Sequence, residues 1–221
     1  MMTMKRSLVV SLFTVLSAFV TSGIAHAGAV TAVPCAAKAK AVIANTGDAL
    51  HNSNTTVTGD VQARRTIIKN GSTAVITGTQ TQNTPANLAV VPVPASTTNL
   101  GNYVVNGTVT LPAGNYRANS FIINSGSTLI ISGGIAQIWV TGASLTLGGT
   151  ANAGGDPTNL EFLVTSQQFV NVNANSNITA FIYAPIAGVV VGGTVNGSVV
   201  GSSTTINGGG AVNFVAAATC P

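Results

Sequence analysis

The chain has 221 residues, and only 5% of them are Asp, Glu, Lys or Arg, where an average globular protein has about a quarter. Eight basic, four acidic and two histidine residues leave little material for a multi-carboxylate active site, a basic nucleic-acid groove or a metal cluster. The hydrophobic fraction of 46% is ordinary, so we expect a packed core rather than disorder.

Residues 1–27 have the pattern of a cleaved secretory signal. Lys5 and Arg6 precede an apolar run over residues 8–20, and Ala25-His26-Ala27 supplies the small residues that a signal peptidase recognises. An uncleaved membrane anchor is the alternative. Cleavage would lower the formal net charge from +4 to +2, so the basic pI is no argument for nucleic acid. We expect an exported mature chain without membrane insertion.

Residues 28–54 form the predicted N-terminal segment, which is rich in alanine. This composition favours one short helix within residues 34–50 that ends near Asn45 and Gly47.

From residue 55 onward, short β-branched runs recur, and each ends in glycine. Three pairs of such glycines have similar spacings: Gly59 and Gly78, Gly133 and Gly148, Gly192 and Gly208. Units of this size cannot bury their apolar face alone and must stack on one another. The pattern predicts an all-β, right-handed parallel β-solenoid over residues 55–221, with first coils at 55–82, a connector at 83–106 and a main body at 107–221. A β-sandwich is the alternative.

The connector contains Pro85, Pro92 and Pro94 and has no helical periodicity. These prolines favour an extended segment. At about 3.3 Å per residue it is long enough to run the whole length of the solenoid body.

Cys35 and Cys220 lie near the two ends of the mature chain, and in an exported protein they should be oxidised. The ends of a simple solenoid are too far apart for a disulfide. Either the first coils stack on the last coil, which brings the two cysteines together, or each cysteine pairs with a neighbouring molecule and gives a head-to-tail polymer.

The segments 111–116, 126–133 and 138–142 resemble the body of secreted bacterial β-helix domains, and 181–193 with 197–201 is similar to their closing coils. Such domains resemble the ice-binding-like family and domains of pilus-associated and surface proteins. In the ice-binding-like family a first coil packs beside the last and a long helix crosses between them, which implies an intramolecular Cys35–Cys220 bridge. This sequence has the proline-rich connector in place of that helix.

Few residues suggest catalysis. Asp156 and Glu161 lie close together in the sequence across a turn and could flank the groove of a hydrolase or lyase, but the Gly-Gly-Asp-Pro sequence favours a turn-forming aspartate and an exposed glutamate. His51 could pair with Asp48, yet its polar surroundings favour a solvated loop histidine. We therefore predict no catalytic residue, no metal site and no cofactor.

The basic residues are concentrated near the N-terminus: Lys38, Lys40, Arg64, Arg65 and Lys69. They could contact an anionic polysaccharide, but a solvated edge that protects the first coils from foreign strands is favoured. The aromatic residues are scattered one per segment, which favours core filling and capping of the ends over a stacking platform.

A flat face with regularly spaced outward threonines would suit ice or a polysaccharide. Candidates are Thr108, Thr110, Thr128 and Thr146. We expect Thr110 and Thr146 to occupy equivalent outward positions, with Ile130 at the comparable place between them.

Together these features predict an exported, non-enzymatic structural or adhesive solenoid. Its partner would be another copy of itself or a surface polysaccharide, outside the cell, on its surface or in the periplasm. The alternative is a module that binds ice or a polysaccharide through the threonine-bearing face.

Overall fold

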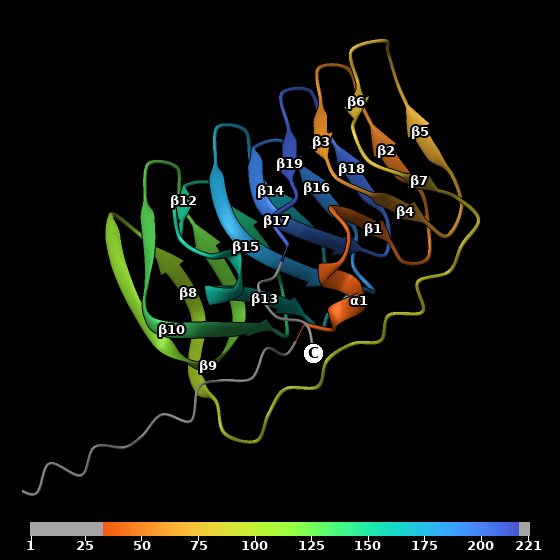
Figure 1. Ribbon diagram of the computed structural model, residues 1–221. Helices are drawn as coiled ribbons and strands as arrows, with labels where there is room; N and C mark the ends of the chain where they lie inside the picture. The colour runs from red at the N-terminus through yellow and green to blue at the C-terminus, as the bar shows by residue number, and fades with distance from the viewer. Residues whose placement is uncertain (1–32, 217–221) are drawn as a thin grey trace, which may run out of the picture.

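The computed structural model describes residues 33–216, which form a parallel β-solenoid of about nine turns (Figure 1). Nineteen strands belong to one continuous sheet, and every strand pair is parallel. The predicted all-β solenoid with a short N-terminal helix is therefore confirmed. The expected signal peptide, residues 1–27, and Cys220 lie outside the described residues, so cleavage and the disulfide remain predictions.

The N-terminal part of the described chain contains one helix and seven short strands. They are α1 (Cys35–Lys38), β1 (Val42–Ala44), β2 (Ala49–His51), β3 (Thr56–Thr58), β4 (Val61–Ala63), β5 (Ile67–Lys69), β6 (Val75–Ile76) and β7 (Gln80–Thr81). The main body follows a connector and holds twelve strands and a 3₁₀ turn. They are β8 (Thr98–Val105), β9 (Thr108–Ile123), β10 (Thr128–Val140), β11 (Leu145–Leu147), β12 (Thr150–Ala151), η1 (Pro157–Asn159), β13 (Leu160–Val164), β14 (Val170–Val172), β15 (Asn177–Ala184), β16 (Val189–Val191), β17 (Thr194–Gly201), β18 (Thr204–Ile206) and β19 (Ala211–Asn213).

The alternation of apolar and polar residues along the sequence explains why these segments form strands with one buried side. In β11, Leu145 and Leu147 are buried while Thr146 points outward, as the two-residue period of a strand requires. The inward residues of successive coils stack into one core inside the solenoid, which includes Phe121 and Phe162. The two rings make an edge contact with centroids 5.5 Å apart.

Strand pairing divides the surface into three faces. The threonine face consists of β3, β6, β12, β19 and the N-terminal parts of β9, β10, β15 and β17. The second face consists of β2, β5, β11, β14, β16, β18 and the C-terminal ends of β8 and β9. The covered face consists of β1, β4, β7, β13 and the remaining parts of β8, β9, β10, β15 and β17.

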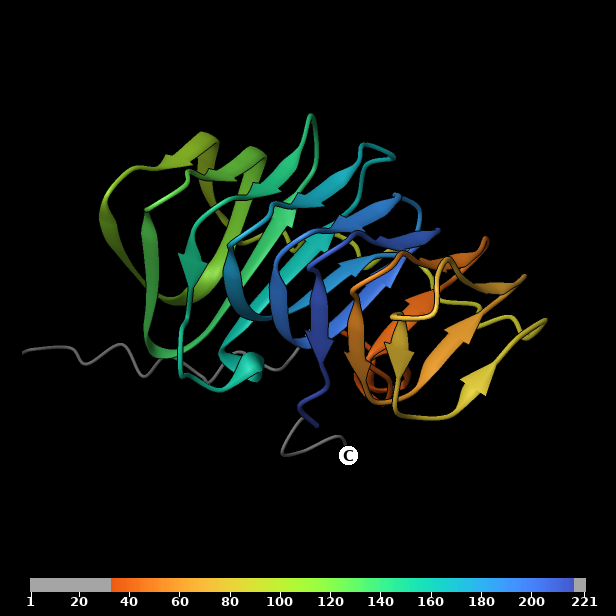
Figure 2. The same ribbon diagram turned by 90° about the horizontal axis from the view of Figure 1, so that it is seen from above.

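The first coils stack on the last coil of the body, as one of the two sequence-based arrangements requires. β1, β2 and β3 pair with β17, β18 and β19 respectively. The N-terminal coils thus continue the stack beyond the C-terminal coil, and the body begins at the opposite end with β8 (Figures 1 and 2). This order needs a connector that runs the length of the molecule.

The solenoid begins earlier than the sequence suggested. Helix α1 has four residues, and strands begin at Val42 rather than near residue 55. Ala41, Ala44 and Ala49 have no exposed surface, because small side chains fit the narrow interior of these coils. Ala44 and Ala49 therefore serve as core residues of β1 and β2, where tertiary packing overrides helix propensity.

Coil lengths are also less uniform than the spacing of the glycines suggested. Paired positions on the threonine face are Thr108, Thr128, Thr150, Asn177, Thr194 and Ala211, and the interval from Thr150 to Asn177 is the longest. This longest coil contains η1, in which Asp156 Oδ1 accepts hydrogen bonds from Thr158 N (2.8 Å) and Oγ1 (2.7 Å). The predicted turn-forming role of Asp156 is confirmed.

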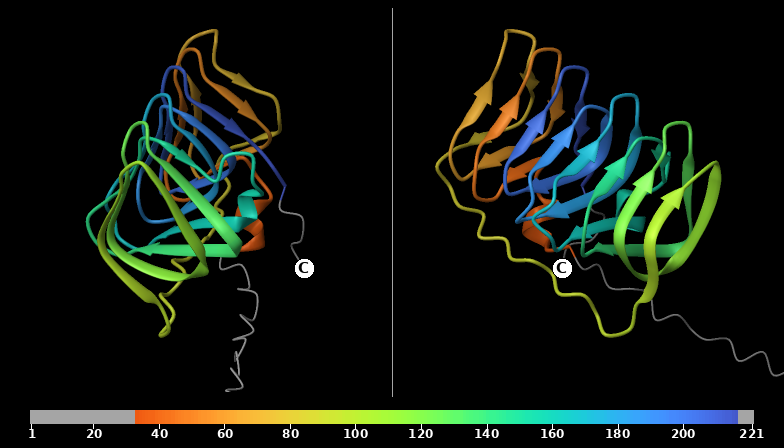
Figure 3. Two further views of the ribbon diagram at one scale, coloured as in Figure 1. Left: turned by 90° about the vertical axis from the view of Figure 1, so that its left-hand side faces the viewer. Right: turned by 180° about the vertical axis from the view of Figure 1, so that it is seen from behind.

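The connector, residues 82–97, lies against the covered face (Figure 3). Its residues Leu88, Val91 and Val93 pack on a second hydrophobic cluster outside the coils, which contains Trp139 and Tyr183. The Tyr183 hydroxyl donates to Ala89 O (2.6 Å), and burial raises the pKa of Tyr183 to about 12. Residues 98–105, predicted to belong to the connector, form β8 instead.

Aromatic residues follow the expected core and end positions only in part. Phe121 lies in the core, and Tyr103 stacks on it at the β8 end with ring centroids 5.2 Å apart. Trp139 and Tyr183 instead point away from the core and are buried by the connector and α1. Phe169 is 62% exposed.

Candidate binding face

The threonine face carries a row of outward side chains, one from each coil, which we call the first row. Strand pairing aligns them in the order Thr108, Thr128, Thr150, Asn177, Thr194, Ala211, Thr56 and Val75. Five of the eight are threonines, and neighbouring strands of a sheet lie about 4.8 Å apart. The row therefore spans about 34 Å, with consecutive threonines at Thr108, Thr128 and Thr150 and single threonines further along.

A second, less regular row lies two positions further along the same strands. It includes Thr110 beside Ile130, and then the buried Thr179 (4% exposed) followed by Asn196, Asn213 and Thr58 in register. Between these groups Asn152 has a left-handed backbone (φ 49°), and its Nδ2 donates to Asp156 O and Thr179 O at 2.9 and 3.1 Å. The 152–159 insertion therefore interrupts the second row and leaves the first row intact.

Asparagine amides fix the surface of this face. Asn213 Nδ2 donates to Asn196 Oδ1, and Asn196 Nδ2 donates to Asn177 Oδ1, each at 3.0 Å. Because each amide holds its neighbour, these side chains are ordered before any ligand arrives, which lowers the entropic cost of binding.

Both rows consist of uncharged residues. The burial of their strands alternates: Thr56 and Thr58 in β3 are exposed while Val57 has no exposed surface. The face is thus a neutral surface of hydroxyl, methyl and amide groups on a rigid sheet. Neither α1 nor the connector covers it, because both lie against the covered face.

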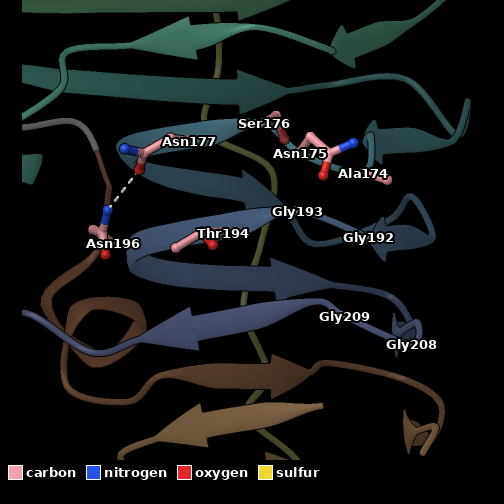
Figure 4. Close-up of a pocket in the computed structure, with 10 residues that line it drawn as sticks. All are labelled: Ala174, Asn175, Ser176, Asn177, Gly192, Gly193, Thr194, Asn196, Gly208 and Gly209. Carbon is pink, nitrogen blue, oxygen red and sulfur yellow. Dashed lines mark hydrogen bonds between the residues drawn. The ribbon is translucent and has the colours of Figure 1, made fainter. Parts of the chain in front are cut away.

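A hollow adjoins the first row at the corner between the second face and the threonine face (Figure 4). It has a volume of about 570 Å³ and is lined by residues of three successive coils: Ala174, Asn175, Ser176, Asn177, Gly192, Gly193, Thr194, Asn196, Gly208 and Gly209. The Gly192-Gly193 corner is set back between two longer corners, 173–176 and 207–210. A Cβ at Gly193 would collide with Ser176 Oγ and Asn173 O, so the hollow depends on glycine there.

The predicted site threonines fall on two faces. Thr108, Thr110 and Thr128 lie together on the threonine face. Thr146 lies on the second face, where it pairs with Ile122 and Asn171. The expected equivalence of Thr110 and Thr146 was wrong, because the segment from Gly133 to Gly148 crosses the covered face and the second face of one coil and does not reach the next coil.

Glu161 was expected to be exposed, and the structure contradicts this. Its side chain has no exposed surface and forms a 2.7 Å ion pair with the equally buried Lys38. The hydrolase arrangement of Asp156 and Glu161 is not formed, since Asp156 caps η1 at the surface while Glu161 lies beneath α1. The alternation of residues along a strand shows which side chains point outward. It does not show which of these another segment covers, so the burial of Glu161 could not be predicted from it.

His51 was expected to be solvated, but it has no exposed surface and points into the core at the end of β2. Asp48 does not pair with it and accepts a hydrogen bond from Thr66 N (2.9 Å). Desolvation, with a smaller contribution from the charge of Lys69, lowers the pKa of His51 to about 4. Alternation with Ala49 was the signal for its inward direction.

The basic residues separate into three environments. Arg64, Arg65 and Lys69 are exposed near the end of the stack, as predicted for a solvated edge. Lys40 Nζ lies 3.7 Å from Asp60 Oδ2 and forms an ion pair with it. Lys38 is buried in its ion pair with Glu161. Among residues 33–216, no group of three His, Cys, Asp or Glu side chains could hold a metal ion. No helix in that part of the chain is long and apolar enough to cross a membrane.

Solved structures share this architecture. An ice-binding protein from the Antarctic ascomycete Antarctomyces psychrotrophicus is 18% identical with a TM-score of 0.60, covering 81% of this chain and 96% of the other. A glycosylated ice-binding protein from an Arctic yeast is 19% identical with a TM-score of 0.57, and the match covers 87% of this chain and 99% of the other. One from an Antarctic bacterium of the Flavobacteriaceae is 20% identical with a TM-score of 0.60, covering 83% of this chain and 47% of the other.

The fold and the exposed face thus define a parallel β-solenoid of the architecture seen in these ice-binding proteins. The search of curated proteins gives no match. The chain belongs to the DUF7305 family, a domain of unknown function whose model matches residues 48–219.

Proposed function

We propose that the threonine face binds ice. The observation that carries this proposal is the first row, in which five of the eight aligned positions are threonines and three of these are consecutive. A crystal surface presents the same groups at fixed intervals, so a rigid repeat can engage it at many points at once. The ice-binding proteins with the same fold support the proposal, although the low identity transfers the fold alone.

The test is thermal hysteresis and inhibition of ice recrystallisation by the purified mature protein. Lysine at Thr128 and Thr150, two adjacent positions of the first row, should abolish most of the activity because a charged side chain holds water and breaks the flat surface. The matched control places lysine at Thr146 and Thr205, outward threonines of the second face, and should leave the activity unchanged. Absence of activity in the unsubstituted protein, or equal loss in both variants, would refute the proposal.

A structural or adhesive role through self-association is a second proposal. It rests on the outward row of the second face, where Val104 and Ile68 are 43% and 39% exposed and Val190 and Leu50 lie between them. Five of the eight residues of this row are apolar, the others being Thr146, Asn171 and Thr205. Exposed apolar side chains on a neutral surface favour association. Light scattering over a range of concentrations tests it: growth of particle size that Val190→Glu reverses supports self-association, and a monomer at every concentration excludes it.

Polysaccharide binding would use the hollow beside Gly193 and the amides of Asn175, Asn177 and Asn196. A glycan array with the unsubstituted protein and with Ala174→Trp, which places a bulky side chain at an exposed lining position of the hollow, distinguishes this function from ice binding. Binding that survives the tryptophan would place the glycan elsewhere.

A further inference from the structure

One buried polar cluster has no part in the proposed binding face. The Glu161 carboxylate bridges two side chains beneath α1: Lys38 Nζ lies 2.7 Å from Oε1, and Gln137 Nε2 donates to Oε2 at 3.0 Å. Gln137 and Glu161 are register partners on β10 and β13. The exposed fractions of Lys38, Gln137 and Glu161 are 2%, 3% and 0%.

Val33 N also donates to Glu161 Oε2 at 3.4 Å, and the side chains packed against this cluster are mainly apolar. Phe181, the register partner of Glu161 on the next strand, places its ring centroid 4.8 Å from Lys38 Nζ. Trp139 and Leu163 belong to the same buried cluster as Phe181. Water is therefore excluded from the amine, the carboxylate and the carboxamide together.

An ion pair in this position is a poor stabiliser, because the cost of removing two charges from water offsets their attraction. A primary amine and a carboxamide that contact the two oxygens of one carboxylate in a dry site are however suited to acyl transfer. The carboxylate can accept a proton from the amine and act as general acid and base, and the fixed geometry replaces a bimolecular encounter.

We propose that Lys38 and Gln137 join in an amide cross-link, with Glu161 as the proton carrier. Glu161 Oε1 takes one proton from the Lys38 ammonium, and the Nζ lone pair then forms a bond to Gln137 Cδ. Glu161 delivers that proton to Nε2, the Cδ–Nε2 bond breaks and ammonia leaves. Glu161 finally takes a proton from the new amide nitrogen and remains neutral.

The balance of this reaction favours product. One ammonium, one carboxylate and one carboxamide become a secondary amide, a carboxylic acid and ammonia, with no oxidant or reductant. The reaction removes the buried charge pair, whose retention in an apolar site is unfavourable. Ammonia escapes to solvent, and exclusion of water protects the new amide from hydrolysis.

The cross-link would fasten α1 to β10, which are far apart in the sequence. It closes a covalent loop around the first coils and the connector. Closing a loop of this length restricts the unfolded chain and holds the N-terminal segment on the covered face.

Mass spectrometry of the purified, reduced mature protein tests the proposal. The expected intact mass is that of the sequence less one ammonia, and tryptic digestion should give a branched peptide that joins residues 38 and 137, with no cleavage after Lys38. An unchanged mass overturns the proposal. Loss of one water, with a branch between residues 38 and 161, overturns the assignment of Gln137.

Two variants test the roles of the partners. Lys38→Arg keeps a positive charge for Glu161 but has no reactive amine, so it should retain the full mass. Glu161→Gln removes the proton carrier with little change of shape and should leave residues 38 and 137 unlinked. Circular dichroism of both variants reports whether the solenoid forms, and a 38–137 branch that persists in Glu161→Gln would show that Glu161 is not the carrier.

Discussion

Protonation of His51 should destabilise the solenoid below neutral pH. The imidazole is fully buried, and neither Nδ1 nor Nε2 has a hydrogen-bond partner within the described part of the chain. Its register partners are Ile206 on one side and Lys69 on the other, so a proton on His51 would be desolvated and would face a like charge. Both effects lower its pKa from 6.5 to about 4.

Thermodynamic linkage between proton binding and folding gives the sign and the size of the change in the free energy of unfolding. Above pH 6.5 the histidine is neutral in both the folded and the unfolded chain and costs no stability. As the pH falls below 6.5 the unfolded chain takes up the proton first, so stability decreases until the folded pKa of about 4 is reached. Between pH 7.5 and 5 the free energy of unfolding should fall by about 2 kcal/mol, since one pKa unit corresponds to about 1.4 kcal/mol.

Urea denaturation followed by circular dichroism at pH 7.5, 6.5, 5.5 and 5 measures this decrease. His51→Leu fills the same core position without a titrating group, and its stability should vary much less over this range. A matched control adds Leu50→His to that variant, which places the imidazole at the outward neighbouring position and should not restore the pH dependence. Parallel curves for the unsubstituted protein and His51→Leu would refute the reasoning.

Two further predictions concern a corner and the connector. In Gly149→Ala the added Cβ would collide with the Ser127 carbonyl oxygen, so we expect the free energy of unfolding, measured in a thermal melt, to fall by about 2 kcal/mol. In the control Gly208→Ala the atom nearest to the added Cβ is 3.3 Å away. A decrease for this control as large as that for Gly149→Ala would contradict the steric argument. Tyr183→Phe removes the hydrogen bond to Ala89 O and should cost about 1 kcal/mol. Limited proteolysis should then cut the connector faster, and unchanged cleavage would show that this bond does not hold it.

The first coils show how far the pattern of side chains predicts the fold. Glycine-ended runs such as Thr56-Val57-Thr58-Gly59 and Val75-Ile76-Thr77-Gly78 predicted strands that pair, and β3 and β6 do pair. The alternation of Val109, Thr110 and Leu111 predicted the outward direction of Thr110. Both signals are local, because they depend on the two-residue period of a strand and on glycine at corners.

The candidate face was predicted only in part, because these local signals do not determine on which face of the solenoid a strand lies. Thr108, Thr110 and Thr128 were assigned together correctly, whereas Thr146 was placed in the wrong row. The row to which a strand belongs depends on the number of residues in the corners and in long strands such as β9, which crosses three faces. That number varies between coils, so periodicity does not fix it.

The sequence by itself determined that this chain stacks short strands into a charge-poor solenoid whose surface is rich in threonine, serine, asparagine and glycine. Only the tertiary structure decided which outward residues meet solvent. Glu161 and Trp139 point outward from their strands, as Thr110 does, but α1 and the connector lie over them. Burial of an outward residue depends on segments that are distant in sequence, and therefore the buried Lys38–Glu161 pair and the exposed threonine row became visible only when those segments were placed.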